Sequence, residues 1–425
     1  MTSVHPLHDP AFQRLYSAQV VALLGTGLLT VALGLLAHDM AGRNAGTVLG
    51  TALTIKMAAY VFVAPLMAAA TVRVPARALL IATDVLRAAV ALALPFVESV
   101  WQIYLLVFVL QAASATFTPA FQSVIAATLS DEHTYTQALS LSRMAYDLES
   151  LASPVLAAAL LTVLDYPALF LGTVAGFLSS ATAILSVRLP GAPERTRPQP
   201  FRDRVWRGAR IMWSAADLRA LLALNLVVAA ATGLVMVNTV VYVGDLLGAG
   251  ETGLAVALAC YGGGSLLAAL GAPRILLITS DRTVMLAGAV TCAAGLSATA
   301  LFLAAAPNGL TGWIALAALW PALGVGTAMV SMPAPRLLRR NSTAGDRSEV
   351  FSAQFSLSHA GFLLTYPVAG WIGATLGQAV AALCLAALAT LATLVAVNVW
   401  PRPGREFHGS TARKPFVTVA GQPGP

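Results

Sequence analysis

The feature that most constrains this chain is a series of apolar stretches, each long enough to cross a lipid bilayer and separated by short polar or Pro- and Gly-containing turns. Hydrophobic residues make up 58% of the 425 residues and charged residues only 10%, against roughly 25% in soluble domains. So few charges cannot cover the surface of a soluble protein of this size. The sequence predicts an all-α polytopic membrane protein, and it excludes a disordered chain, a disulfide-rich secreted scaffold and a soluble α/β enzyme.

The spacing of the apolar stretches predicts twelve transmembrane helices in two pseudo-symmetric halves of six. The predicted helices cover residues 16–38, 46–70, 78–97, 102–127, 136–164, 168–187, 219–244, 251–277, 283–305, 311–334, 350–376 and 378–399. The predicted domains are a cytoplasmic N-terminal segment (1–15), a six-helix half (16–187), a basic linker with an amphipathic helix (188–218), a second six-helix half (219–399) and a disordered cytoplasmic tail (400–425).

Arginine is concentrated in the turns that follow the even-numbered helices, in the linker and in the tail. The opposite set of turns has Arg43 as its one obvious cation. Because cytoplasmic loops carry the excess of Lys and Arg, this asymmetry places both termini and the linker in the cytoplasm. The amphipathic part of the linker is interpreted as an interfacial helix on the inner leaflet, with lipid-facing arginines. The positive charge is not interpreted as a nucleic-acid-binding surface.

A weak internal repeat supports the division into two halves. The fifth and eleventh predicted helices both contain Ser-Leu-Ser followed by an ionisable residue, which is Arg143 in one and His359 in the other. A Pro-Val-small motif follows in each, at Pro154 and Pro367.

Twelve helices in two halves joined by a basic loop resemble the major facilitator superfamily, and the order of motifs resembles its bacterial efflux branch, which includes siderophore exporters and nickel-resistance transporters. Arg73 and Arg77 occupy basic positions of the family's loop motif between helices 2 and 3, although its acidic residue and glycines are absent. Asp281 and Arg282 match the second-half counterpart. The resemblance implies a gating role for these four residues and a secondary transporter in the bacterial inner membrane.

Ionisable residues inside the predicted helices are the main candidates for function, because a charge in hydrocarbon is costly and rarely kept without a role. Removal from water favours the neutral form of a carboxylate, as a proton carrier requires. The predicted proton-coupling residues are Glu149, Asp147 and His359. A fixed salt bridge for Glu149 and a simple hydrogen bond for His359 remain open alternatives.

Other polar side chains in the helices are predicted to line a substrate cavity, with helix–helix hydrogen bonds as the equal alternative. They are Lys56, Arg87, Gln111, Gln122, Asn225, Asn238, Gln354 and Tyr366. Asp84 and Arg87, three residues apart, are predicted to form a structural pair, and Arg143 with Asp147 to form another that locks one conformation. Lys56 is also a candidate counter-ion for Glu149 or a contact for an anionic substrate group.

No catalytic or nucleotide-binding motif is visible, and the three cysteines show no metal-site spacing, so neither an enzyme nor a cofactor is expected. The predicted function is proton-coupled export of a small amphiphilic compound by a monomer in the lipid bilayer. Two alternatives are kept: efflux of a divalent metal such as nickel, with His359 as a possible ligand, and a non-transporting membrane sensor or scaffold.

Overall fold

The computed structural model describes residues 6–41, 45–129, 131–187, 189, 200–248, 251–305 and 309–400. All regular structure in these ranges is helical. The first bundle contains α1 (Pro10–Ala41), α2 (Ala45–Ala58), the π turn η3 (Ala59–Val63), α3 (Ala64–Ala70), α4 (Ala76–Ala93), α5 (Val100–Thr128), α6 (Glu132–Leu161) and α7 (Pro167–Leu185). The linker carries α8 (Phe201–Ser214).

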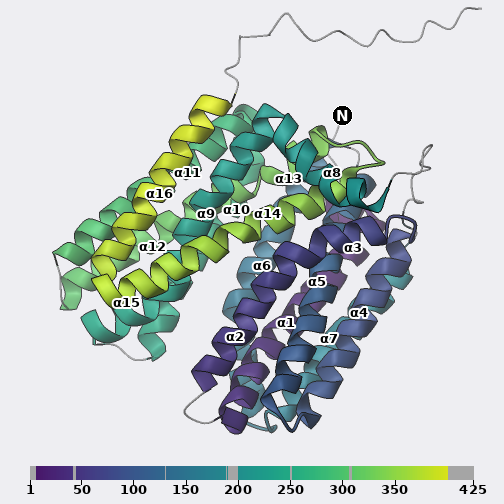
Figure 1. The fold of residues 1–425 in the computed structure, drawn as a ribbon, viewed down its shortest axis with the longest axis horizontal. Coiled ribbons are helices and arrows are strands. Elements are labelled where there is room, and N and C mark those ends of the chain that lie inside the picture. The colour runs from purple at the N-terminus through teal and green to yellow at the C-terminus, as the bar shows by residue number, and fades with distance from the viewer. Residues whose placement is uncertain are drawn as a thin grey trace, which may run out of the picture.

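The second bundle follows α8 and repeats the same design. It contains α9 (Ala216–Val241), η5 (Tyr242–Leu246), α10 (Glu251–Ile278), α11 (Asp281–Ala304), α12 (Gly309–Ser331), α13 (Ala334–Arg340), α14 (Arg347–Pro367), η6 (Val368–Ile372), α15 (Gly373–Leu376) and α16 (Gln378–Val399). Figure 1 shows the two bundles meeting at the end that carries α8 and α13 and diverging toward the end that carries α15. The predicted all-helical membrane fold is confirmed.

Nine helices in the described residues are long and apolar enough to cross a membrane, and Thr54–Ala70 is a shorter apolar helix. Two helices that were predicted to span, α6 and α14, are not among the nine; both are richer in polar residues than the other long helices, and several α6 side chains lie outside the described residues. Both pack against helices of the other bundle. Their lower hydrophobicity follows from facing protein and cavity, where lipid contact is not required.

Helix starts follow local capping rules, and this moves some boundaries. The side chain of Asp9 accepts hydrogen bonds from the backbone amides of Ala11 and Phe12, and Pro10 takes the first helical position. Helix α1 therefore begins six residues before the predicted residue 16. At α5, Ser99 and Gln102 form a capping box.

Helices within one bundle approach each other closely through glycine. A Cβ on Gly264 of α10 would lie 2.1 Å from the carbonyl oxygen of Pro321, and one on Gly324 of α12 would lie 2.0 Å from that of Tyr261. Only a residue without a side chain fits at these two points, so the α10 and α12 backbones touch directly.

Contacts between the bundles are made by side chains. Ser140 of α6 donates a hydrogen bond to the carbonyl of Ala269 in α10. Ser356 of α14 donates one to the carbonyl of Val61 in η3. Both serines belong to the repeated Ser-Leu-Ser sequence, so the repeat marks the two equivalent contacts between the halves. We call these contacts the α6–α10 seam and the α14–η3 seam.

A charge cluster joins the bundles beside the α6–α10 seam. Glu132 at the start of α6 lies 3.0 Å from both Arg336 and Arg340 of α13. Asp281 at the start of α11 pairs with the same two arginines, at 2.6 Å from Arg340 and 3.5 Å from Arg336. The guanidinium of Arg339 lies over the ring of Tyr135 in α6. These six residues form the inter-bundle charge cluster, which holds α6 against α13.

Candidate functional site

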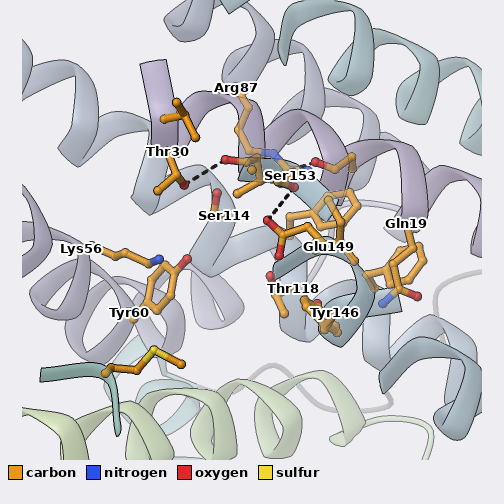
Figure 2. A pocket seen from close by; sticks show the side chains of 18 residues that line it. Gln19, Thr30, Lys56, Tyr60, Arg87, Ser114, Thr118, Tyr146, Glu149 and Ser153 are labelled. Carbon is orange, nitrogen blue, oxygen red and sulfur yellow. Dashed lines mark hydrogen bonds between the residues drawn. The ribbon is translucent and has the colours of Figure 1, made fainter. Parts of the chain in front are cut away.

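The main candidate site is a cavity of about 530 Å³ in the first bundle, which we call the central cavity. Its walls come from α1, α2, η3, α4, α5 and α6, and Met236 of α9 contributes from the second bundle. This volume suits a drug-sized organic molecule. Figure 2 shows the polar side chains that reach it, among them Lys56, Tyr60 and Glu149.

Glu149 lines the central cavity from α6, near the middle of that helix. It accepts a hydrogen bond from Ser153, one turn further on, at 3.4 Å. A Cβ on Gly27 of α1 would lie 1.9 Å from the Ser153 hydroxyl and 2.7 Å from a Glu149 carboxyl oxygen. Gly27 therefore leaves the space in which the Ser153–Glu149 pair lies. Glu149 enters no ion pair with the residues that the structure describes.

Lys56 lines the central cavity from α2, and its ammonium lies 5.7 Å from the centre of the Tyr60 ring. Figure 2 shows Lys56 and Tyr60 together on one side of the cavity and Glu149 with Ser153 away from them. Within the described part of the chain Lys56 makes no ion pair, so Lys56 and Glu149 face the same cavity without joining.

Asp84 and Arg87 form the predicted intrahelical ion pair on α4. Asp84 is fully buried, and Arg87 is 5% exposed. The guanidinium of Arg87 contacts two rings, 4.2 Å from the centre of Phe117 and 4.5 Å from that of Phe177. Arg87 borders the central cavity, but it pairs with Asp84 and packs on two aromatic rings.

A second cavity of about 200 Å³ lies between α5, α9, α13 and α14. Its lining includes three of the predicted cavity residues, Gln122, Asn225 and Gln354. The amides of Asn225 and Gln354 donate to each other, both at 3.0 Å. Amides and hydroxyls without charge dominate its polar lining, in contrast to the central cavity.

His359 lies on α14 in an aromatic cluster at the α14–η3 seam. Its ring centre is 4.8 Å from that of Tyr60 and 4.4 Å from that of Phe355. Its Nδ1 lies 2.7 Å from the backbone carbonyl of Phe355. No group of three or more His, Cys, Asp or Glu side chains able to hold a metal ion occurs in the described ranges.

The remaining predicted site residues lie elsewhere. Asn238 donates to the carbonyl of Ala369 and to Gln378, and thereby joins α9 to η6 and α16. Tyr366 packs on Phe362, with ring centres 5.1 Å apart. Gln111 lies on α5 and borders neither of the two cavities.

The predicted gating and structural residues also have defined places. Arg143 donates to the hydroxyl of Ser265 at 2.8 and 3.1 Å across the α6–α10 seam. Arg77 donates to the carbonyl of Leu185, and Arg73 is exposed in the turn before α4. Arg282 is half-buried beside Asp281, and Pro367 ends α14 where η6 begins. The side chains of Asp147 and Pro154 lie outside the described residues.

Sequence reasoning missed the roles of Glu132, Arg336 and Tyr60. The first two were visible only as charges near helix ends, which are common on any cytoplasmic surface. Tyr60 contacts both Lys56 and His359, and its position four residues after Lys56 was the available signal.

Comparisons with known proteins identify the fold. A sequence profile described as Major Facilitator Superfamily matches residues 15–282. No curated protein sequence matches the chain.

Solved structures resemble the chain over most of its length. The human organic anion transporter MFSD10 (TETRAN) gives a TM-score of 0.74 at 14% identity, over 91% of this chain and 99% of that one. A bacterial homologue of the iron transporter ferroportin, in an outward-facing state, gives 0.75 at 14% identity, over 92% and 99%. The E. coli fucose:proton symporter FucP gives 0.69 at 16% identity, over 92% and 98%. At these identities the likeness concerns the fold alone.

Proposed function

The chain belongs to the Major Facilitator Superfamily, and from that premise we propose that it is a proton-coupled exporter of a small amphiphilic compound. Membership makes it a multi-pass membrane protein and a secondary transporter, and the prediction that it is not an enzyme is confirmed. The proposal adds the coupling ion, the direction and the class of substrate.

Glu149 is the observation that carries the proposal. It is a carboxylate on the wall of a drug-sized cavity, with a serine hydroxyl as its hydrogen-bond donor and no ion pair among the described residues. A carboxylate at membrane depth without a fixed counter-ion can gain or lose a proton as its surroundings change. Of the three predicted coupling residues, Glu149 is therefore favoured over His359, whose ring is enclosed by aromatic neighbours.

The proposed cycle follows from the two-bundle arrangement. We infer from the arginine distribution that the termini, α8 and α13 face the cytoplasm. On that orientation the bundles are joined at the cytoplasmic end, which supports an outward-facing state. Protonation of Glu149 from outside removes its charge and allows the bundles to rock to the inward-facing state. Release of the proton to the cytoplasm restores the carboxylate, which then binds the next substrate molecule.

The test uses everted membrane vesicles energised with a pH gradient, a pH-sensitive fluorescent dye and a panel of amphiphilic drugs. Wild-type protein should release protons when a transported drug is added. Glu149→Gln should abolish this release and uphill transport while leaving the protein folded, and the exposed Glu98→Gln should behave as wild type. A Glu149→Gln variant that pumps at the wild-type rate would contradict the assignment of Glu149 as the coupling residue. If no compound in the panel caused proton release by the wild-type protein, a non-transporting role would be favoured.

A further inference from the structure

We propose that the central cavity binds a zwitterionic substrate, with a cationic group at Glu149, an anionic group at Lys56 and an apolar body between them. The inference rests on the proposed function and deepens it by naming the substrate's charges. It depends on the placement of two charged side chains on different walls of one cavity.

The two charges lie on separate elements. Lys56 extends from α2 beside Tyr60, and Glu149 extends from α6 beside Ser153. Both line the same cavity, and they form no ion pair with each other or with another residue in the part of the chain that the structure describes. Opposite charges that face a shared space without pairing can each bind a complementary group of a ligand.

Arg87 does not supply the positive site, although it also borders the cavity. Asp84 pairs with it on the same helix. Its guanidinium also packs on the rings of Phe117 and Phe177. A ligand anion at Arg87 would compete with a fully buried carboxylate, so Lys56 is the cation available to it.

The rest of the wall fits an apolar body. Phe117, Phe121 and Tyr146 contribute rings and Met236 contributes a thioether from the second bundle. A flexible methionine adapts to ligands of different shape. Contact with Met236 also links the substrate to both bundles, as a transported molecule requires.

A zwitterion explains how proton binding and substrate binding oppose each other. With Glu149 ionised, the cavity offers one negative and one positive site. Once Glu149 is protonated, the cationic group of the substrate loses its partner and only the Lys56 contact remains. Proton uptake therefore weakens substrate binding, which is the condition for exchange of one against the other.

The experiment measures binding to purified protein in detergent, without a gradient. The probes are peptides of one to three residues that begin with naphthylalanine, each in four forms: free, C-terminally amidated, N-acetylated, and blocked at both ends. Wild-type protein should bind the free form of the best length about 10-fold more tightly than either singly blocked form, because a hydrogen bond to a charged group contributes about 1.5 kcal/mol.

Two variants assign the charges. Lys56→Gln should bind the free and amidated forms equally, and Glu149→Gln should bind the free and N-acetylated forms equally. Lys56→Arg and Glu149→Asp should restore selectivity, and the exposed Arg202→Gln should not alter it. Thermal unfolding of each variant establishes that it is folded.

Equal binding of all four forms by wild-type protein would overturn the inference, as would saturable binding of none of the three lengths at millimolar concentration. An equal loss for all four forms in both variants would also overturn it. Selective binding without proton release in vesicles would leave the zwitterion site standing and remove the proposed function. Proton-coupled transport of compounds without charge selectivity would support the proposed function and contradict the zwitterion site.

Discussion

The α6–α10 seam and the α14–η3 seam both contain the sequence Ser-Leu-Ser, but the residues that follow it make different contacts. In each, the first serine of Ser-Leu-Ser donates to a backbone carbonyl of the opposite bundle. Three residues later, Arg143 donates to Ser265 in the first seam, whereas His359 packs on Tyr60 in the second. One seam is held by charged hydrogen bonds and the other by aromatic packing.

The starts of α6 and α14 also differ in their side-chain contacts. Asp131 caps α6 by accepting from the Thr134 amide at 2.7 Å. Asp346, before α14, accepts from the Thr343 amide and lies 3.5 Å from Arg207 of α8. The two-fold design thus keeps backbone contacts and changes side chains. Only the α6–α10 seam is expected to respond strongly to salt and charge substitution.

Removal of Asp281 should have the largest effect. Asp281 is 7% exposed and pairs with Arg336, which is equally buried. Asp281→Asn removes the buried carboxylate that pairs with both Arg336 and Arg340, and leaves Arg336 with the half-exposed Glu132 alone, so it should cost about 3 kcal/mol of stability. Thermal unfolding in detergent measures the loss. Asp203→Asn, at an exposed pair on α8, is the matched control and should change little; similar losses in both would contradict the assignment.

Substitution of both ionisable seam residues by phenylalanine compares the seams directly. Arg143→Phe removes charged hydrogen bonds to a fully buried serine and should cost about 2 kcal/mol. His359→Phe keeps ring packing and loses the contact with the Phe355 carbonyl, so its cost should stay below about 1 kcal/mol. Unfolding and transport are measured for both. Loss of transport in the folded His359→Phe variant would show that His359 acts as an ionisable group.

Glu132→Gln should have a moderate effect. It removes two ion pairs to α13 from a carboxylate whose side chain is 43% exposed, worth about 1 kcal/mol together. Distances between spin labels on α6 and α13 should show about a fivefold rise in the population in which the two helices are separated. High salt should produce part of this rise in wild-type protein and none in the variant. A salt-independent distance distribution in wild type would argue against the charge cluster as a lock.

Asp131→Ala should have the smallest effect, about 0.5 kcal/mol, because this helix cap is exposed. Hydrogen bonds from Thr134 lower the pKa of Asp131 below 3.8. A lowered pKa in the folded state adds stability above the unfolded pKa, and this is lost as pH falls through the folded value. The difference between wild type and Asp131→Ala should therefore be constant at neutral pH and shrink below about pH 3.8. A difference that persists in acid would contradict the cap.

The sequence predicted the helices and the repeat well because each depends on local pattern. Apolar stretches locate α1 and α16, and the Ser-Leu-Ser match indicated two related halves. That both copies lie at contacts between the bundles was not predicted. The cavity was less predictable, since helices that are apolar all round do not reveal which face turns inward. Gln122 and Gln354 line the second cavity, whereas Asn238 joins helices, and nothing in their sequence context separates them. The partners of Glu132 are more than 200 residues away, so only the fold brings them together.

The glycine contacts within the second bundle determine where the molecule can yield. At Gly264 and Gly324 two main chains touch with nothing between them, and neither can slide without collision. The second bundle is therefore rigid at this contact, and we expect a conformational change to alter contacts elsewhere in the molecule. The bundles are joined instead by side-chain hydrogen bonds and ion pairs, such as those at Ser140, Ser356 and Glu132, each of which water can replace. Two rigid bundles joined by contacts that water can replace are able to move relative to each other without unfolding.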